Sequence, residues 1–122
     1  MAKAVHDDVL DGALNVIKTN STYMCFCNAQ PTTRAEAYAT YMLALQAVVT
    51  GDFTLSNGDV SGRKFRMAAK SGISVTNSGT CTHIAFVDGT RLLAVTTNVS
   101  QPLVAAATFD CPAFDFELAD PT

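Results

Sequence analysis

Two pairs of potential metal ligands occur in the sequence, and in each pair a single residue separates the members. They are Cys25 and Cys27, in the run Tyr-Met-Cys-Phe-Cys, and Cys81 and His83. Alternate side chains of a β-strand point to the same face, so each pair would project from one side of its strand. Zinc is usually held by four cysteine or histidine side chains. If the two strands were neighbours, Cys25, Cys27, Cys81 and His83 would form a zinc site, and the chain would be a small metal-binding module.

The spacing and surroundings of these residues favour a structural role instead. Zinc-binding cysteines are normally separated by roughly two to four residues, commonly in a glycine-containing turn, and neither feature is present here. Residues 23–27 are an apolar run with no polar face. This run predicts a strand that is buried on both sides, or held between a sheet and the helix before it. Because unpaired cysteine is among the most buried residue types, we predict core cysteines and no bound metal or other cofactor.

Neither histidine belongs to a recognisable catalytic group. His6 precedes Asp7 and Asp8 at the expected start of a helix, where aspartate is an ordinary capping residue. A Cys81–His83 nucleophilic pair would need a third group to orient the histidine and an oxyanion site, and the sequence identifies neither. No glycine-rich phosphate loop follows a predicted strand. The sequence therefore predicts no catalytic residues, no cofactor-binding residues and no enzymatic activity.

The composition is that of a folded domain with a mildly acidic surface. The 122 residues are 48% hydrophobic and 16% charged, and the formal net charge is −3. A chain of this length can bury a substantial core, so we predict a single domain over residues 1–122. Arg63, Lys64 and Arg66 form the one basic cluster, which we interpret as a solvated strand edge. A nucleic-acid-binding surface normally needs a longer basic stripe, so no nucleic-acid partner is expected.

Nothing in the sequence indicates export or membrane insertion. The first ten residues, Met-Ala-Lys-Ala-Val-His-Asp-Asp-Val-Leu, lack the apolar segment of a signal peptide. No apolar run approaches the roughly 20 residues that span a bilayer. We therefore expect synthesis in a reducing cytoplasm, where the four cysteines are not presumed to form disulfides.

Residues 1–20 have the pattern of an amphipathic helix. Apolar side chains recur at helical spacing, with Asp7 or Asp8 as the expected N-cap. The stripe comprises Val9, Leu10, Ala13, Leu14 and Ile17. Gly12 disfavours the helix by about 1 kcal/mol, so the helix should depend on docking against the rest of the chain. A shorter helical segment is predicted at 34–39, after a Thr33–Glu36 capping box.

Residues 21–122 have the pattern of an antiparallel β-domain. Short apolar segments alternate with turn residues, among them Asn57-Gly58 and Asp88-Gly89, which are typical of two-residue hairpins. After the strand at 23–27, strands are predicted at 41–49, 53–55, 64–68, 73–76, 81–87, 91–97, 103–109 and 114–118. The fold class predicted is mainly β: a single antiparallel β-sandwich or small barrel with an N-terminal α-helix.

Three stretches of the chain resemble small virion structural proteins of tailed bacteriophages. They are CNAQPTTRAEA (27–37), GDFTLSNGDVSGRKFRMAAKSGISVTNSGTCTHIAFVDG (51–89) and FELADPT (116–122), and the resemblance extends over most of the chain. It implies a capsid decoration (cement) protein that binds the outer surface of the phage head after synthesis in the host cytoplasm. The implied partner is the major capsid protein or another virion protein.

The resemblance leaves two matters open. A tail-associated or head-fibre structural protein is the near alternative, because the same gene neighbourhoods encode such proteins. Small cement proteins often sit at symmetry axes as trimers, so the resemblance is also compatible with a homo-oligomer. It carries over no catalytic residue, and it does not identify which surface of the chain contacts the partner.

Overall fold

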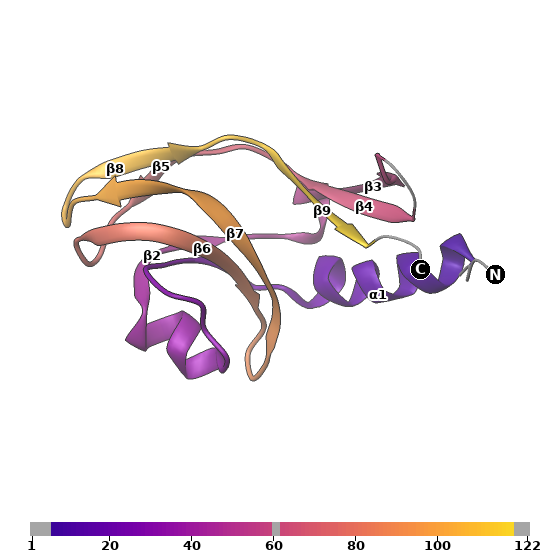
Figure 1. Ribbon diagram of the computed structural model, residues 1–122, viewed down its shortest axis with the longest axis horizontal. Coiled ribbons are helices and arrows are strands. Elements are labelled where there is room, and N and C mark those ends of the chain that lie inside the picture. Colours follow the sequence, from indigo (N-terminus) through magenta and orange to yellow (C-terminus); the bar gives the residue numbers. More distant parts are fainter. Residues whose placement is uncertain (1–5, 60–61, 119–122) are drawn as a thin grey trace.

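The computed structural model describes residues 6–59 and 62–118 and confirms a mainly β fold with an N-terminal helix. Figure 1 shows the antiparallel strands curled into a half-barrel, with the helix beside one end. In chain order the elements are α1 (Asp7–Asn20), β1 (Tyr23–Cys27), η1 (Glu36–Thr40), β2 (Met42–Ala47), η2 (Thr50–Asp52), β3 (Phe53–Asn57), β4 (Arg63–Met67), β5 (Lys70–Ser74), β6 (Gly79–Val87), β7 (Leu92–Leu103), β8 (Thr108–Cys111) and β9 (Phe114–Leu118).

The strands form three antiparallel groups that continue into one another. The largest sheet has the order β2-β1-β6-β7, and the others are β3-β4-β9 and β5-β8. β4 leads directly into β5, and β8 leads into β9 past Pro112, which has no N–H to donate to a ladder. The register runs from Met67 opposite Phe114 to Lys70 opposite Cys111, so these four strands make one long bent ribbon. A bridge between Ala44 and Val75 joins this ribbon to β2.

Helix α1 is docked through one side of its apolar stripe. Leu10, Leu14 and Ile17 are buried against β3, β4 and the start of η2, whereas Val9 is 63% exposed. The expected aspartate cap is wrong: His6 is the N-cap, and its Nδ1 accepts the backbone N–H of Asp8 at 3.0 Å. An imidazole nitrogen can therefore take the place of the usual oxygen at this helix end.

The main core lies between the curled sheet, the ribbon and α1, and it contains every phenylalanine of the chain. Edge-to-face or tilted ring contacts link Phe53, Phe65 and Phe86, with centroids 5.0–5.6 Å apart. Phe65 stacks on Phe116 at 5.3 Å, and Phe26 meets Phe109 at 4.9 Å. Offset and edge-to-face pairs of this kind add to the stabilisation from burial alone.

A second, smaller apolar cluster lies on the other face of the sheet and contains every tyrosine. Cys25 and Cys27 belong to it, whereas Met24 and Phe26 face the main core. β1 is thus buried on both faces, as its apolar sequence predicts. The covering segment is η1, however, and not the N-terminal helix, which packs against the β3–β4 side. Tyr23, Tyr38 and Tyr41 line the edge of this cluster.

Several local predictions need correction. The strand predicted at 103–109 is wrong: β7 runs on to Leu103, and a turn with Ala106 at φ 71° precedes β8. The apolar composition of that segment imitated a strand, although the side chains of residues 104–108 are exposed. The Asp-Gly and Asn-Gly sites are also not two-residue hairpins, since neither Gly58 nor Gly89 has a positive φ. At 33–36 the Glu36 N–H donates to the Thr33 hydroxyl, as the capping box predicts, and the Glu36 carboxylate accepts from the N–H groups of both Thr33 and Thr32 and from the Thr32 hydroxyl.

Candidate interaction surfaces

The four residues of the potential zinc site do not come together. Cys25 and Cys27 lie in the smaller cluster and Cys81 in the main core. His83 is opposite Cys27 in the ladder, and its Nδ1 is 2.8 Å from the Thr82 hydroxyl. Within residues 6–59 and 62–118, no group of three or more His, Cys, Asp or Glu side chains could hold a metal ion. Desolvation by burial raises the pKa of the Cys25 and Cys27 thiols to about 12, which disfavours the thiolate that metals bind.

The basic cluster on β4 is neutralised by carboxylates, and its interpretation as a strand edge is wrong because β4 is the central strand of its sheet. Arg63 Nε lies 2.8 Å from Asp11 Oδ1, which ties α1 to β4. Lys64 Nζ lies 2.7 Å from Asp59 and 3.0 Å from Asp115, and Arg66 also reaches Asp115. With these pairs the cluster presents no uncompensated positive surface to phosphates.

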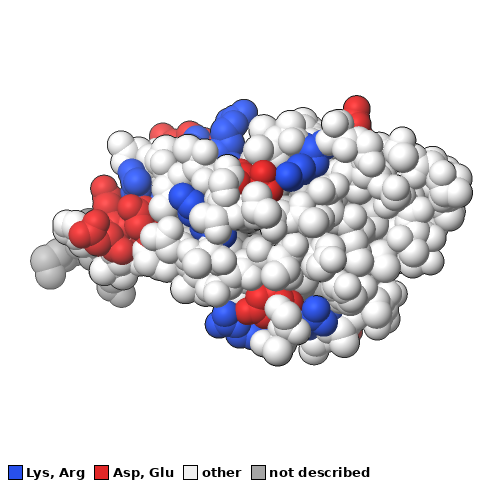
Figure 2. Space-filling view, turned by 180° about the vertical axis from the view of Figure 1, so that it is seen from behind, with Lys and Arg blue, Asp and Glu red and all other residues white. Residues whose placement is uncertain are grey.

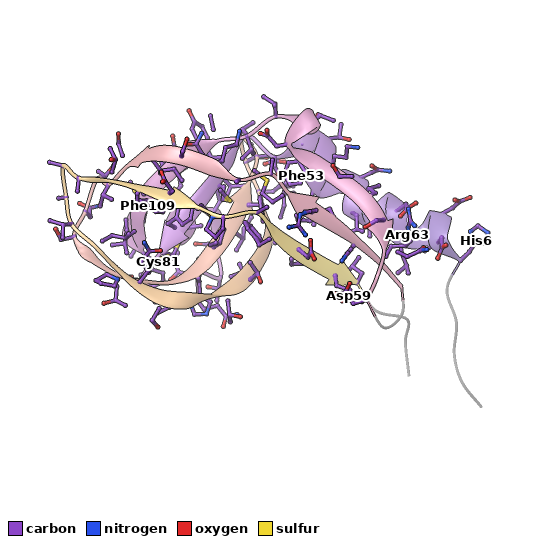
Figure 3. The ribbon with its side chains drawn as sticks, turned by 90° about the horizontal axis from the view of Figure 1, so that it is seen from above. His6, Phe53, Asp59, Arg63, Cys81 and Phe109 are labelled. Atoms are coloured by element: carbon purple, nitrogen blue, oxygen red, sulfur yellow. The ribbon has the colours of Figure 1, made fainter. Side chains whose placement is uncertain are left out.

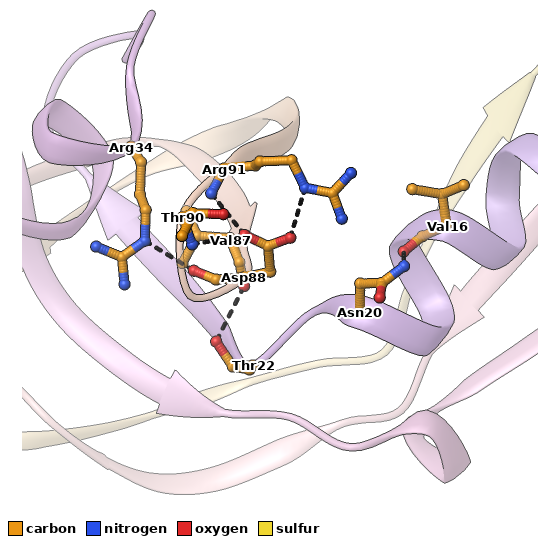
Figure 4. Close-up of polar contacts among 8 residues, drawn as sticks. All are labelled: Val16, Asn20, Thr22, Arg34, Val87, Asp88, Thr90 and Arg91. Carbon is orange, nitrogen blue, oxygen red and sulfur yellow. Dashed lines mark hydrogen bonds and ion pairs between the residues drawn. The ribbon is translucent and has the colours of Figure 1, made fainter.

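The β6–β7 turn holds a buried carboxylate that accepts several hydrogen bonds (Figure 4). Asp88 is 8% exposed and accepts hydrogen bonds from the backbone N–H groups of Thr90 and Arg91 and from Arg91 Nε. Chiefly because of the Thr90 N–H, and also because of Arg91, the pKa of this carboxyl falls to about 2. Arg34 Nε donates to the Asp88 carbonyl at 2.7 Å and its guanidinium covers the Tyr38 ring. The Asp88 carboxylate stays ionised at neutral pH and fixes the turn, so it is unsuited to proton transfer.

A hollow of about 340 Å³ lies where the ribbon bends, between β5 and β8. Its two charged side chains already have protein partners. Lys70 Nζ lies 2.9 Å from Asp52, and Asp110 accepts the backbone N–H of Gly72 at 2.9 Å. Small-molecule sites normally present several converging polar groups that remain available to the ligand. This hollow does not meet that description.

A large region without charged residues is the remaining candidate for an interaction surface. Segments 71–87 and 92–109 contain no Lys, Arg, Asp or Glu. They include most of β5, all of β6 and β7, the connections from β5 to β6 and from β7 to β8, and the start of β8. Figure 2 shows the back of the molecule, where charged side chains lie mainly on one half and the other half is almost entirely uncharged. In Figure 3, Arg63 and Asp59 lie at the α1 end, and Cys81 and Phe109 lie toward the opposite end.

The uncharged region exposes apolar as well as polar side chains. Val104 is 64% exposed, and residues 105–108, which continue the same turn, are exposed as well. The centres of protein–protein interfaces are depleted in charged residues relative to the rest of the surface. The distribution of charges along the sequence carried this signal, but the sequence does not show that the two segments meet in space.

No family model, no curated protein and no solved structure matches this chain. Among the described residues, no helix is both long enough and apolar enough to cross a membrane.

Proposed function

We propose that this chain is a bacteriophage virion structural protein, and specifically a capsid decoration (cement) protein on the outer surface of the head. The observation that carries the proposal is the uncharged region formed by segments 71–87 and 92–109. Such a surface is suited to burial against another protein, because no ion needs to be desolvated when the contact forms. The resemblance to small phage virion proteins supports another virion protein as the partner.

The fold suits a protein that acts by binding. Its polar clusters at Asp88 and along β4 are satisfied internally, so they stabilise the domain itself. A ligand that binds the assembled shell, but not the dissociated subunits, stabilises the shell by mass action. At a free concentration of about 100 times Kd, each site gains roughly 2.7 kcal/mol. Many bound copies would therefore strengthen a head without any catalytic step.

Co-sedimentation with undecorated phage heads tests the proposal. We expect the protein to pellet with heads in a saturable manner and to raise the temperature at which the heads release their DNA. The Val104→Asp variant, which places a charge in the uncharged region, should bind at least about tenfold more weakly, as expected for a charge at a buried contact. Val49→Asp is the matched control, because Val49 is also 64% exposed but lies outside that region.

Two results would contradict this assignment. If the protein does not sediment with heads but does sediment with purified tails, the tail-associated alternative replaces the decoration role. If Val104→Asp and Val49→Asp bind heads equally well, the contact surface is not the uncharged region. The major capsid protein is the expected partner, and cross-linking followed by mass spectrometry on decorated heads identifies it.

A further inference from the structure

The outer edge of β7 is a long strand edge without a partner in the described chain. β7 has twelve residues, Leu92–Leu103, and pairs with β6 along one side. No described residue forms a strand against its other side, where it ends the order β2-β1-β6-β7. Figure 1 shows β7 along the outside of the curl. Unpaired N–H and C=O groups on such an edge are a template for a further strand.

The other sheet edges are protected by charge, short length or a covering segment, whereas β7 is open at residues 94–97, between its two register shifts and well before Pro102. β2 is covered at its end by residues 75–77, where the N–H groups of Thr76 and Asn77 donate to the Leu43 carbonyl. β9 carries Asp115 and Glu117, and β3 has only five residues. Charged side chains and short length are the usual means of preventing edge-to-edge association. The whole of β7 lacks a charged residue.

We propose that β7 pairs antiparallel with β7 of a second copy of this chain, so that two four-stranded sheets become one sheet around a two-fold axis. Antiparallel pairing of a strand with itself is two-fold symmetric by construction, which suits an isologous dimer. No like charges would face each other across the axis, because residues 92–103 have none. Asp7 and Asp8 lie in the first turn of α1, at the end of the helix that points away from the curled sheet in Figure 1.

The regular part of β7 marks where the pairing would be centred. Its register with β6 shifts on either side of residues 94–97, and these four residues pair with β6 without interruption. Val95, Thr96 and Thr97 are β-branched, and cross-strand pairs of such residues stabilise antiparallel sheets. Thr97 is exposed, so its side chain is free to meet the second copy.

Light scattering coupled to gel filtration tests the dimer directly. We expect wild-type protein at about 50 µM to have twice the chain mass of 12.9 kDa. Thr97→Glu should shift the protein to the monomer by weakening association at least tenfold, because two carboxylates would lie near the axis. Thr54→Glu is the control, since Thr54 is an exposed strand residue opposite Arg66 and the variant has the same net charge.

Hydrogen exchange locates the contact and separates it from any folding defect. Backbone amides of β7 should exchange more slowly in the wild-type protein than in Thr97→Glu, while those of β1 should be unchanged. A wild-type monomer, a wild-type trimer, or loss of the dimer in both variants alike would overturn the proposal. The dimer is scored by light scattering in the absence of heads, and head binding is scored by co-sedimentation of Val104→Asp, so each proposal has its own measurement.

Discussion

Replacing Leu14 with alanine should destabilise the whole domain, because α1 is part of the main core. The Leu14 side chain is 0% exposed and belongs to the same cluster as Phe53, Phe65 and Met67. The change removes three carbon groups, worth about 2.4 kcal/mol at roughly 0.8 kcal/mol each. The cavity that remains adds to this, so we expect a loss of about 2–5 kcal/mol in the free energy of unfolding. Because small domains are stable by about 5–15 kcal/mol, this is a large fraction of the total.

The control is Val16→Ala on the same helix. Val16 is 43% exposed, and alanine is the better helix former, so the free energy of unfolding should stay within about 0.5 kcal/mol of wild type. The two variants shorten side chains only two positions apart. A difference between them therefore measures burial and not helix propensity.

Urea unfolding monitored by two signals gives the required measurement. Far-UV circular dichroism follows the whole backbone, whereas tyrosine fluorescence follows the outer cluster of Tyr23, Tyr38 and Tyr41, on the far side of the sheet from the main core. If α1 is integral to the domain, Leu14→Ala shifts both transitions together to lower urea. A loss below about 1 kcal/mol, or a tyrosine transition that does not move, would refute the reasoning.

Two further predictions concern ionisable groups. Asp88→Asn should be less stable than wild type at pH 6, and the difference should shrink as the pH falls from about 4 to about 2. The pKa of Asp88 is about 2 in the folded protein and near 3.9 in the unfolded chain. The ionised carboxylate therefore stabilises the fold fully above about pH 4, and this stabilisation is lost as the pH falls toward about 2. Urea titrations of both proteins at each pH measure the difference in unfolding free energy, and a difference that does not change with pH would contradict the prediction. At pH 8 iodoacetamide should leave Cys25 and Cys27 unmodified until the protein is denatured, because burial raises the pKa of both thiols to about 12. Peptide mass spectrometry measures the labelling, and rapid modification of the folded protein would argue against buried thiols.

Features that depend on local sequence could be predicted. The alternation of Phe114, Asp115 and Phe116 predicts β9, which has the expected bounds and alternately half-buried and exposed side chains. The apolar run at 23–27 likewise predicts a strand buried on both faces. These predictions succeed because alternate residues of a strand face opposite sides of the sheet, so the sequence itself shows which side chains are buried. At 103–109 the same reasoning fails, since the apolar residues 104–107 are exposed in a turn between β7 and β8.

Features that depend on which segments meet could not be predicted in this way. Arg63, Lys64 and Arg66 look like an edge cluster in the sequence, but β9, some fifty residues later, pairs with β4 and brings Asp115 to it. Similarly, the spacing of Cys81 and His83 is compatible with a site shared with Cys25 and Cys27. The register shift between them instead leaves Cys81 in the main core. Strand neighbours and bulges are non-local properties, and a single sequence does not encode them in a readable pattern.

The position of the free edge follows from the same non-local pairing and bears on how the molecule could work. Charged residues tie α1, β4 and β9 together, whereas β6 and β7 contain no Lys, Arg, Asp or Glu. A decoration protein needs one surface for the shell, and it gains from a second surface for its own copies because linked copies bind with a higher effective concentration. Thr97 lies near the middle of β7, and Val104 directly follows its last residue. Because both residues belong to the segment 92–109, head binding should be weakened directly in Val104→Asp and in Thr97→Glu, and in Thr97→Glu also through lost avidity.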